Sequence, residues 1–226
     1  MTKKQLLILL AVFVLLAGGL AAWLTFGSDL STGGSPSGDS AASGGVVLTP
    51  ADRTMGNPKA KLVFIEYGAS TCPVCAAWNA ESFATFKSTY VDTGKVFYVF
   101  RQFPISPDDG AAEKIARCLP EDKYFAFIDL LWRNQPLWDH EFGVVDVHGG
   151  LVRVSRMAGL SADQVDKCLD NKAEDDRINK QTADGESRYG ITGTPTFILD
   201  GTNIGTGNVP ISQMSKTIDA ALAAKK

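Results

Sequence analysis

Two cysteines separated by two residues, Cys72 and Cys75, are the side chains in this sequence best suited to chemistry. Two thiols at this spacing can form and break a disulfide, or exchange it with a thiol of another protein. The spacing also occurs in metal sites, but a structural zinc site usually supplies two closely spaced ligand pairs and this chain contains one. A fixed disulfide across so small a loop would remove little chain entropy. The spacing therefore favours thiol–disulfide exchange.

The residues around this pair predict that a strand and a helix present it. Residues 61–67 are β-branched and aromatic, which is typical of a buried strand, and residues 68–71 form a turn. Helical spacing of apolar residues begins at Cys72, and Pro73 suits a first helical turn because it has no N–H group. Free backbone N–H groups at that turn stabilise an anion, so we expect a lowered pKa for the Cys72 thiol. Cys72 is the predicted nucleophile, and Cys75 resolves the mixed disulfide.

The remaining patterns predict an α/β fold. Residues 95–101 form the next strand, which makes a strand–helix–strand unit with a parallel pair. We expect residues 46–48 to be an edge strand, Asp200-Gly201 to turn a hairpin, and Pro210 to begin a last amphipathic helix. Between the strands, apolar periodicity predicts helices at residues 111–118, 123–133, 151–158, 161–171 and 172–189.

Two segments resemble the DsbA-like proteins of the thioredoxin superfamily. Residues 64–75, FIEYGASTCPVC, resemble the active-site strand and turn of that family, and residues 193–197, GTPTF, resemble its cis-proline loop. The resemblance extends from residue 46 to the C-terminus. It implies a thioredoxin-like domain made of residues 46–107 and 189–226, with an inserted all-helical domain at residues 108–188.

The resemblance also implies roles for residues outside the cysteine pair. Pro195 would follow Thr194 through a cis peptide bond, and this loop would offer backbone hydrogen bonds to an extended peptide substrate. Glu66 would lie under the cysteines, where a buried carboxyl group has a raised pKa and can relay a proton. An exposed strand position is the alternative, because Glu is seldom fully buried. Val74 stands where DsbA has a histidine, and Thr71 where an aromatic residue is frequent, which leaves the direction of electron flow open.

Two further cysteines, Cys118 and Cys168, have no closely spaced partner. In an exported domain such residues usually form a disulfide, and some DsbA relatives carry a second, non-catalytic one in the helical domain. We therefore expect a structural disulfide between them. Two buried free thiols and a redox-active pair are the alternatives. His140 and His148 are expected in a surface loop rather than in a ligand set.

The N-terminus predicts export. Lys3 and Lys4 precede an apolar run at residues 6–26, which is long enough to span a bilayer, so residues 1–28 are expected to be a transmembrane anchor with the rest of the chain outside. A cleaved signal sequence is the alternative, in which the domain is soluble in the periplasm. Residues 29–45 are rich in Gly and Ser and are expected to be a flexible linker.

These features predict a thiol–disulfide oxidoreductase at the extracytoplasmic face of the cytoplasmic membrane. We expect a monomeric oxidase of unfolded or reduced exported proteins that needs no cofactor or metal and is regenerated by a redox partner. A reductase or isomerase of the same fold is one alternative. A copper chaperone using Cys72 and Cys75 is another, although no Met or His cluster lies near Cys72 in the sequence. The net charge of −3 excludes nucleic-acid binding as a main function.

Overall fold

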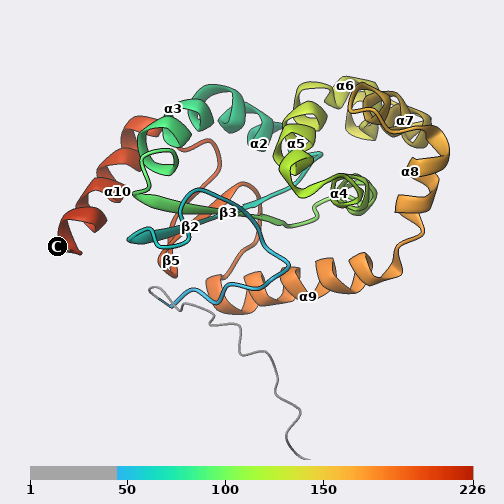
Figure 1. The fold of residues 1–226 in the computed structure, drawn as a ribbon. Helices are drawn as coiled ribbons and strands as arrows, with labels where there is room; N and C mark the ends of the chain where they lie inside the picture. The colour runs from blue at the N-terminus through green and yellow to red at the C-terminus, as the bar shows by residue number, and fades with distance from the viewer. Residues whose placement is uncertain (1–44, 226) are drawn as a thin grey trace, which may run out of the picture. The chain divides into compact units, whose positions relative to one another are not determined.

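The computed structural model describes residues 45–225, and a mixed β-sheet lies at the centre of this part of the chain (Figure 1). The order of its strands is β1-β3-β2-β4-β5. The central strands β2 (Leu62–Gly68) and β3 (Val96–Gln102) are parallel, and the other neighbours are antiparallel. Both central strands are buried along their whole length, which explains their mainly apolar sequences.

A helical stretch links β2 to β3, as the sequence predicts. It begins at Cys72 and runs without a break to Val91, with wider π-type turns in two places. Its parts are α2 (Pro73–Trp78), η1 (Asn79–Phe83), α3 (Ala84–Phe86) and η2 (Lys87–Val91). The strand–helix–strand unit with a parallel pair is therefore confirmed.

A helical region connects β3 to β4. Its α-helices are α4 (Pro107–Cys118), α5 (Tyr124–Arg133), α6 (Gln135–Trp138), α7 (Val147–Met157), α8 (Ala162–Leu169) and α9 (Lys172–Tyr189), with short 3-10 turns η3 (Glu121–Lys123) and η4 (His140–Phe142) between them. Capping boxes begin α4 at Ser106 and α8 at Ser161. The predicted helices are present. The loop prediction is wrong for His148, which lies on α7 because Asp146 caps a helix there.

The last strands form the predicted hairpin, followed by a helix. Strands β4 (Thr196–Leu199) and β5 (Thr202–Thr206) are joined by Asp200 and Gly201, whose φ angles are 46° and 86°. Positive φ at both residues gives the turn type that matches the twist of a hairpin. Helix α10 (Ile211–Ala224) then begins after Pro210.

The predicted edge strand at residues 46–48 is wrong. The edge strand is β1 (Arg53–Met55), which pairs with β3. The Val47 carbonyl instead accepts a hydrogen bond from the buried Arg101 guanidinium at 2.7 Å, while Val46 packs against the sheet. Arg101 also binds both carboxylate oxygens of Asp52, at 2.8 and 2.9 Å. The bond from Arg101 therefore occupies a backbone carbonyl that strand pairing would require.

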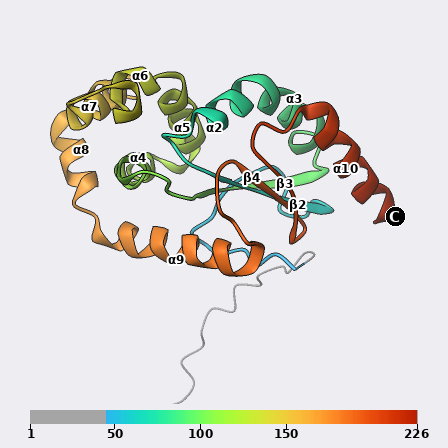
Figure 2. The same ribbon diagram turned by 180° about the vertical axis from the view of Figure 1, so that it is seen from behind.

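The two faces of the sheet have different neighbours. Helices α2, α3 and α10 cover one face and α9 lies across the other (Figures 1 and 2). Because side chains alternate along a strand, Phe64, Glu66 and Gly68 of β2 face the layer that contains the cysteine pair. On the other face, Gly185 allows α9 to approach Tyr67, since a Cβ there would lie 2.8 Å from the tyrosine ring.

Within residues 45–225, no helix has both the length and the apolar character that a membrane span requires. The predicted anchor at residues 6–26 and most of the predicted linker lie outside the described residues.

Candidate active site

Strand β2 leads through a short turn directly to the predicted cysteine pair. Cys72 is the N-cap of α2, and its sulfur accepts the backbone N–H of Cys75 at 3.0 Å. Pro73 takes the first helical position, where its missing N–H is not needed. Both cysteines are in the thiol form and almost completely buried, Cys72 at 2% and Cys75 at 0% exposure. Val74 between them is 40% exposed.

This position separates the two thiols chemically. The hydrogen bond with the Cys75 side chain and the backbone N–H groups of Val74 and Cys75 lower the pKa of Cys72 to about 7, although burial opposes them. Burial raises the pKa of Cys75 well above its usual range, and the neighbouring Cys72 thiolate adds to this shift. Near neutral pH, Cys72 is therefore the thiol that ionises, and Cys75 keeps its proton.

The predicted proline loop lies beside Cys72. The Thr194–Pro195 peptide bond is cis, as the resemblance implies. The Cys72 thiol donates to the Thr194 carbonyl oxygen at 3.5 Å, so residues 122 positions apart meet at the sulfur. The structure therefore brings Cys72, Cys75, Thr194 and Pro195 together.

Glu66 lies on the same face of the sheet and is completely buried. The alternative of an exposed strand position is wrong. The Tyr98 hydroxyl donates to its Oε2 atom at 2.8 Å, and no donor among the described residues reaches Oε1. Burial raises the pKa of Glu66 to about 8, the Tyr98 hydrogen bond opposes this shift, and the Cys72 charge adds to it. The carboxyl group can therefore hold or release a proton near neutral pH.

Three side chains of the helical region hold the turn before Cys72. Trp132 Nε1 donates to the Ala69 carbonyl and Gln135 Nε2 to the Ser70 carbonyl, both at 2.9 Å. The buried Asp109 carboxylate accepts the Thr71 backbone N–H at 2.8 Å and the Thr71 hydroxyl at 3.0 Å. These bonds fix the direction in which the turn enters α2.

Sequence reasoning missed these three residues and Tyr98. Trp132 is buried at 6% exposure, so its sequence position alone indicates a core residue. The one available signal was the Ser106–Asp109 capping pattern, which indicates a helix start but not the contact with Thr71. The contacts join residues 32 to 65 positions apart, so only the tertiary fold reveals them.

The second cysteine pair lies in the helical region. Cys118 at the end of α4 and Cys168 on α8 form a disulfide, with 5.8 Å between their Cα atoms and 50 positions between them in sequence. The predicted pairing is therefore present. His140 lies at the surface, 45% exposed, with its Nδ1 2.5 Å from an Asp108 carboxylate oxygen.

Comparisons with known proteins agree with this geometry. A family model described as Thioredoxin matches residues 48–220. A "Putative protein-disulfide oxidoreductase" of Rickettsia bellii is 28% identical over 176 residues, which cover 77% of this chain and 66% of that protein. The "Probable disulfide bond formation protein D" of Bacillus cereus is 25% identical over 174 residues, which cover 75% of this chain and 78% of that protein.

Solved structures extend the agreement. The crystal structure of Wolbachia pipientis alpha-DsbA1 superposes with a TM-score of 0.71 at 26% identity, covering 80% of this chain and 95% of that one. The chain spans 66% and 62% of the length of two Rickettsia relatives that it matches. Since the family model covers most of the chain and the structural neighbour shares its inserted helical region, this protein belongs to the thioredoxin family and is one of its DsbA-like members.

Proposed function

We propose that this protein is a thiol–disulfide oxidoreductase that oxidises exported proteins through Cys72 and Cys75. One observation carries the proposal: the Cys72 sulfur caps a helix and has a pKa of about 7, next to a buried Cys75 thiol whose pKa is strongly raised. Cys72 is thus a good leaving group as a thiolate, which favours transfer of the disulfide to a substrate. The names of the Rickettsia and Bacillus relatives support the same activity.

The oxidising reaction has two exchange steps. A substrate thiolate attacks the Cys72 sulfur of the Cys72–Cys75 disulfide, so a substrate–Cys72 bond forms and Cys75 leaves as a thiolate. Cys75 then takes a proton from Glu66. A second substrate thiolate attacks the substrate sulfur of the mixed disulfide, and Cys72 leaves as a thiolate. The substrate loses two electrons to the cysteine pair, and a redox partner must remove them to regenerate the disulfide.

The surroundings of Cys72 suit an unfolded polypeptide. The loop at Thr194 presents backbone groups beside the sulfur, where an extended segment can pair with it. Val74, Ile105 and Leu137 expose 40%, 52% and 40% of their surface. The backbone N–H groups of Ile105 and Thr71 both donate to the Asp109 carboxylate. Leu137 lies on α6, the helix whose Gln135 side chain donates to the Ser70 carbonyl. These apolar side chains offer contacts that reduced, unfolded proteins supply.

The cellular setting is part of the proposal. We propose that residues 6–26 anchor the protein in the cytoplasmic membrane, that residues 29–45 link the anchor to the domain, and that a monomer acts on the extracytoplasmic side. The Cys118–Cys168 disulfide supports an oxidising compartment, because such bonds persist there. A soluble periplasmic form after cleavage is the alternative.

Selective alkylation tests the assignment of the nucleophile. Iodoacetamide at pH 6 should modify Cys72 of the reduced protein much faster than Cys75, because about a tenth of Cys72 is thiolate there and Cys75 remains protonated. Peptide mass mapping of each modified cysteine measures the rates. Cys118 and Cys168 serve as internal controls, since the disulfide protects them. Equal rates at the two active-site thiols would contradict the proposal, as would undiminished exchange in Cys72→Ser.

The reduction potential of the pair tests the direction of transfer. Equilibration with glutathione should give a value closer to about −120 mV, typical of an oxidant, than to about −270 mV, typical of a reductant. A value at the reducing end would overturn the oxidase role and leave the exchange activity itself intact.

A further inference from the structure

The proposed function requires a proton to reach Glu66 from solvent, and the part of the chain that the structure describes gives that carboxyl group one side-chain hydrogen bond, from Tyr98. We infer that Tyr98 is a positioning residue. Its hydroxyl connects the Glu66 carboxyl group to solvent in a cavity that Tyr98 lines together with other aromatic side chains. The inference rests on the proposed exchange at Cys72 and Cys75. It assigns to Tyr98 the transfer of the proton that Cys75 gives up or takes back.

Apolar side chains flank Glu66 on both sides within the sheet. Its strand neighbours in register are Phe100 on β3 and Phe197 on β4, both buried aromatic residues without a polar side-chain atom. Cys75 is completely buried. Among residues 45–225, the Tyr98 hydroxyl is the only group that donates to the Glu66 carboxylate. A proton therefore leaves or enters Glu66 through Tyr98 more easily than through the apolar layer around it.

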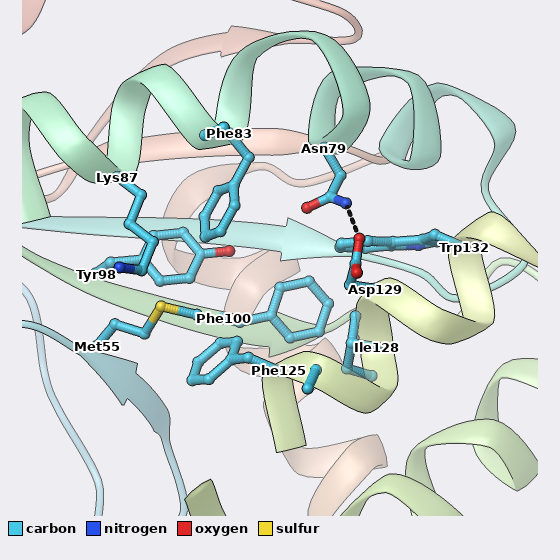
Figure 3. Close-up of a pocket in the computed structure, with 12 residues that line it drawn as sticks. Met55, Asn79, Phe83, Lys87, Tyr98, Phe100, Phe125, Ile128, Asp129 and Trp132 are labelled. Atoms are coloured by element: carbon cyan, nitrogen blue, oxygen red, sulfur yellow. Dashed lines mark hydrogen bonds between the residues drawn. The ribbon is translucent and has the colours of Figure 1, made fainter. Parts of the chain in front are cut away.

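Tyr98 also lines a cavity. The cavity has a volume of about 350 Å³ and is lined mainly by apolar side chains, among them Phe83, Phe100 and Phe125, which lie around Tyr98 in Figure 3. Its lining also includes the hydrogen-bonded Asn79–Asp129 pair, the half-buried Lys87 and the exposed Ala84 and Ala126, so it reaches the protein surface. This volume is enough for several water molecules, which need polar partners such as the Tyr98 hydroxyl.

The transfer balances in atoms and electrons. When Cys75 resolves a mixed disulfide, its thiol gives a proton to the Glu66 carboxylate, and its sulfur attacks Cys72. The Cys75–Cys72 bond forms, and the thiolate bonded to Cys72 leaves with the electron pair. Protonated Glu66 passes its proton to the Tyr98 oxygen while Tyr98 releases its own hydroxyl proton to water in the cavity. The same chain runs in reverse when Cys75 leaves as a thiolate and needs a proton.

An aromatic disulfide, 5,5′-dithiobis(2-nitrobenzoate), tests the inference in stopped-flow measurements on the full-length reduced protein. Cys72 attacks the reagent and releases one coloured thiolate, and Cys75 then resolves the mixed disulfide and releases a second. The first phase reports Cys72, and the second phase reports proton transfer from Cys75. Tyr98→Phe removes the hydroxyl and keeps the ring.

We expect Tyr98→Phe to leave the first phase within about twofold of wild type and to slow the second about tenfold at pH 7, a modest effect for general acid–base catalysis. The pH midpoint of the second phase should move up, because the Tyr98 hydrogen bond lowers the pKa of Glu66. In a Glu66→Gln background, Tyr98→Phe should have no further effect. Tyr124→Phe is the matched control, since its hydroxyl donates to another buried carboxylate, Glu113, at 2.7 Å. It should leave both phases unchanged.

The outcomes separate the two proposals. If wild-type protein shows no first phase, the proposed function fails. If wild type shows both phases and folded Tyr98→Phe matches it in rate and pH midpoint, only the role of Tyr98 fails. The role of Tyr98 would also be overturned if Tyr98→Phe slowed the second phase as much in the Glu66→Gln background as in wild type. Should Tyr98→Phe not fold, the solvent isotope effect on the second phase decides. It must be larger in wild type than in Glu66→Gln, and equal effects overturn the inference.

Discussion

Two regions of this molecule each combine a buried glutamate, a tyrosine hydroxyl and a pair of cysteines. In the helical region, Glu113 accepts from Tyr124 at 2.7 Å and also binds Arg117 at 2.7 Å and Arg177 at 2.6 Å. In the sheet region, Glu66 accepts from Tyr98 at 2.8 Å and has no second donor among the described residues. The cysteine pairs also differ, since Cys118 and Cys168 form a disulfide whereas Cys72 and Cys75 are free thiols.

The helical region uses its groups to hold elements together. Glu113 and Arg117 belong to α4, Tyr124 to α5 and Arg177 to α9, so one carboxylate joins three helices. The Cys118–Cys168 disulfide joins α4 to α8.

The sheet region leaves its groups able to react. Cys72 and Cys75 remain thiols, and burial without a cation raises the pKa of Glu66 to about 8. Glutamate and cysteine side chains are therefore structural in the helical region, where arginines and a disulfide bond engage them. They are reactive in the sheet region, where these partners are missing among the described residues.

Glu113→Gln should have the largest effect on stability. It removes the more deeply buried of the two carboxylates that Arg117 and Arg177 share, so that only Glu174 still pairs with these guanidinium groups, whose side chains are 9% and 14% exposed. Removing one member of a buried ion pair typically costs about 3–5 kcal/mol. Urea unfolding with the Cys118–Cys168 disulfide intact measures the loss. The alkylation rate of Cys72 in the folded variant should stay at its wild-type value, and a large change would break the separation of the two regions.

Replacing both Cys118 and Cys168 by Ser should be nearly as destabilising. A cross-link that closes a loop of 50 positions contributes about 4 kcal/mol in the chain-entropy model. Urea unfolding under oxidising conditions, compared with wild type, gives this difference. Dithiol exchange at Cys72 should persist at temperatures where the variant is folded. If exchange disappears while the fold remains, the second pair has a redox role.

Glu66→Gln should change the pH dependence of stability. Because the pKa of Glu66 rises from an ordinary value of 4.5 to about 8 on folding, the unfolded chain ionises first as pH rises. Glu66 should therefore lower the stability of the reduced wild-type protein from about pH 4.5 to about pH 8, at up to about 1.4 kcal/mol per pH unit, and contribute no further change above that. Melting temperatures of wild type and Glu66→Gln across this range test the sign. Parallel curves would show that Glu66 is ionised in the fold.

The sequence by itself determined the parts that depend on local chemistry. Alternation and apolar runs identified β2, β3, the hairpin at Asp200-Gly201 and most helices, because these patterns reflect contacts between near neighbours. The position of Cys72 at the start of a helix predicted its lowered pKa, because the hydrogen bond with the Cys75 side chain, which is the largest cause, and the backbone N–H groups of Val74 and Cys75 all belong to the next three residues.

Only the tertiary structure decided which distant groups complete each site. It showed that Val47 contacts Arg101 rather than a strand, that Asp109 holds Thr71, and that Glu66 is buried with Tyr98 as its donor. The local sequence shows part of the difference between Glu66 and Glu113, since Arg117 lies one helical turn after Glu113. The rest of the difference depends on whether Arg177 of α9 reaches Glu113, and that depends on how helices far apart in the chain pack.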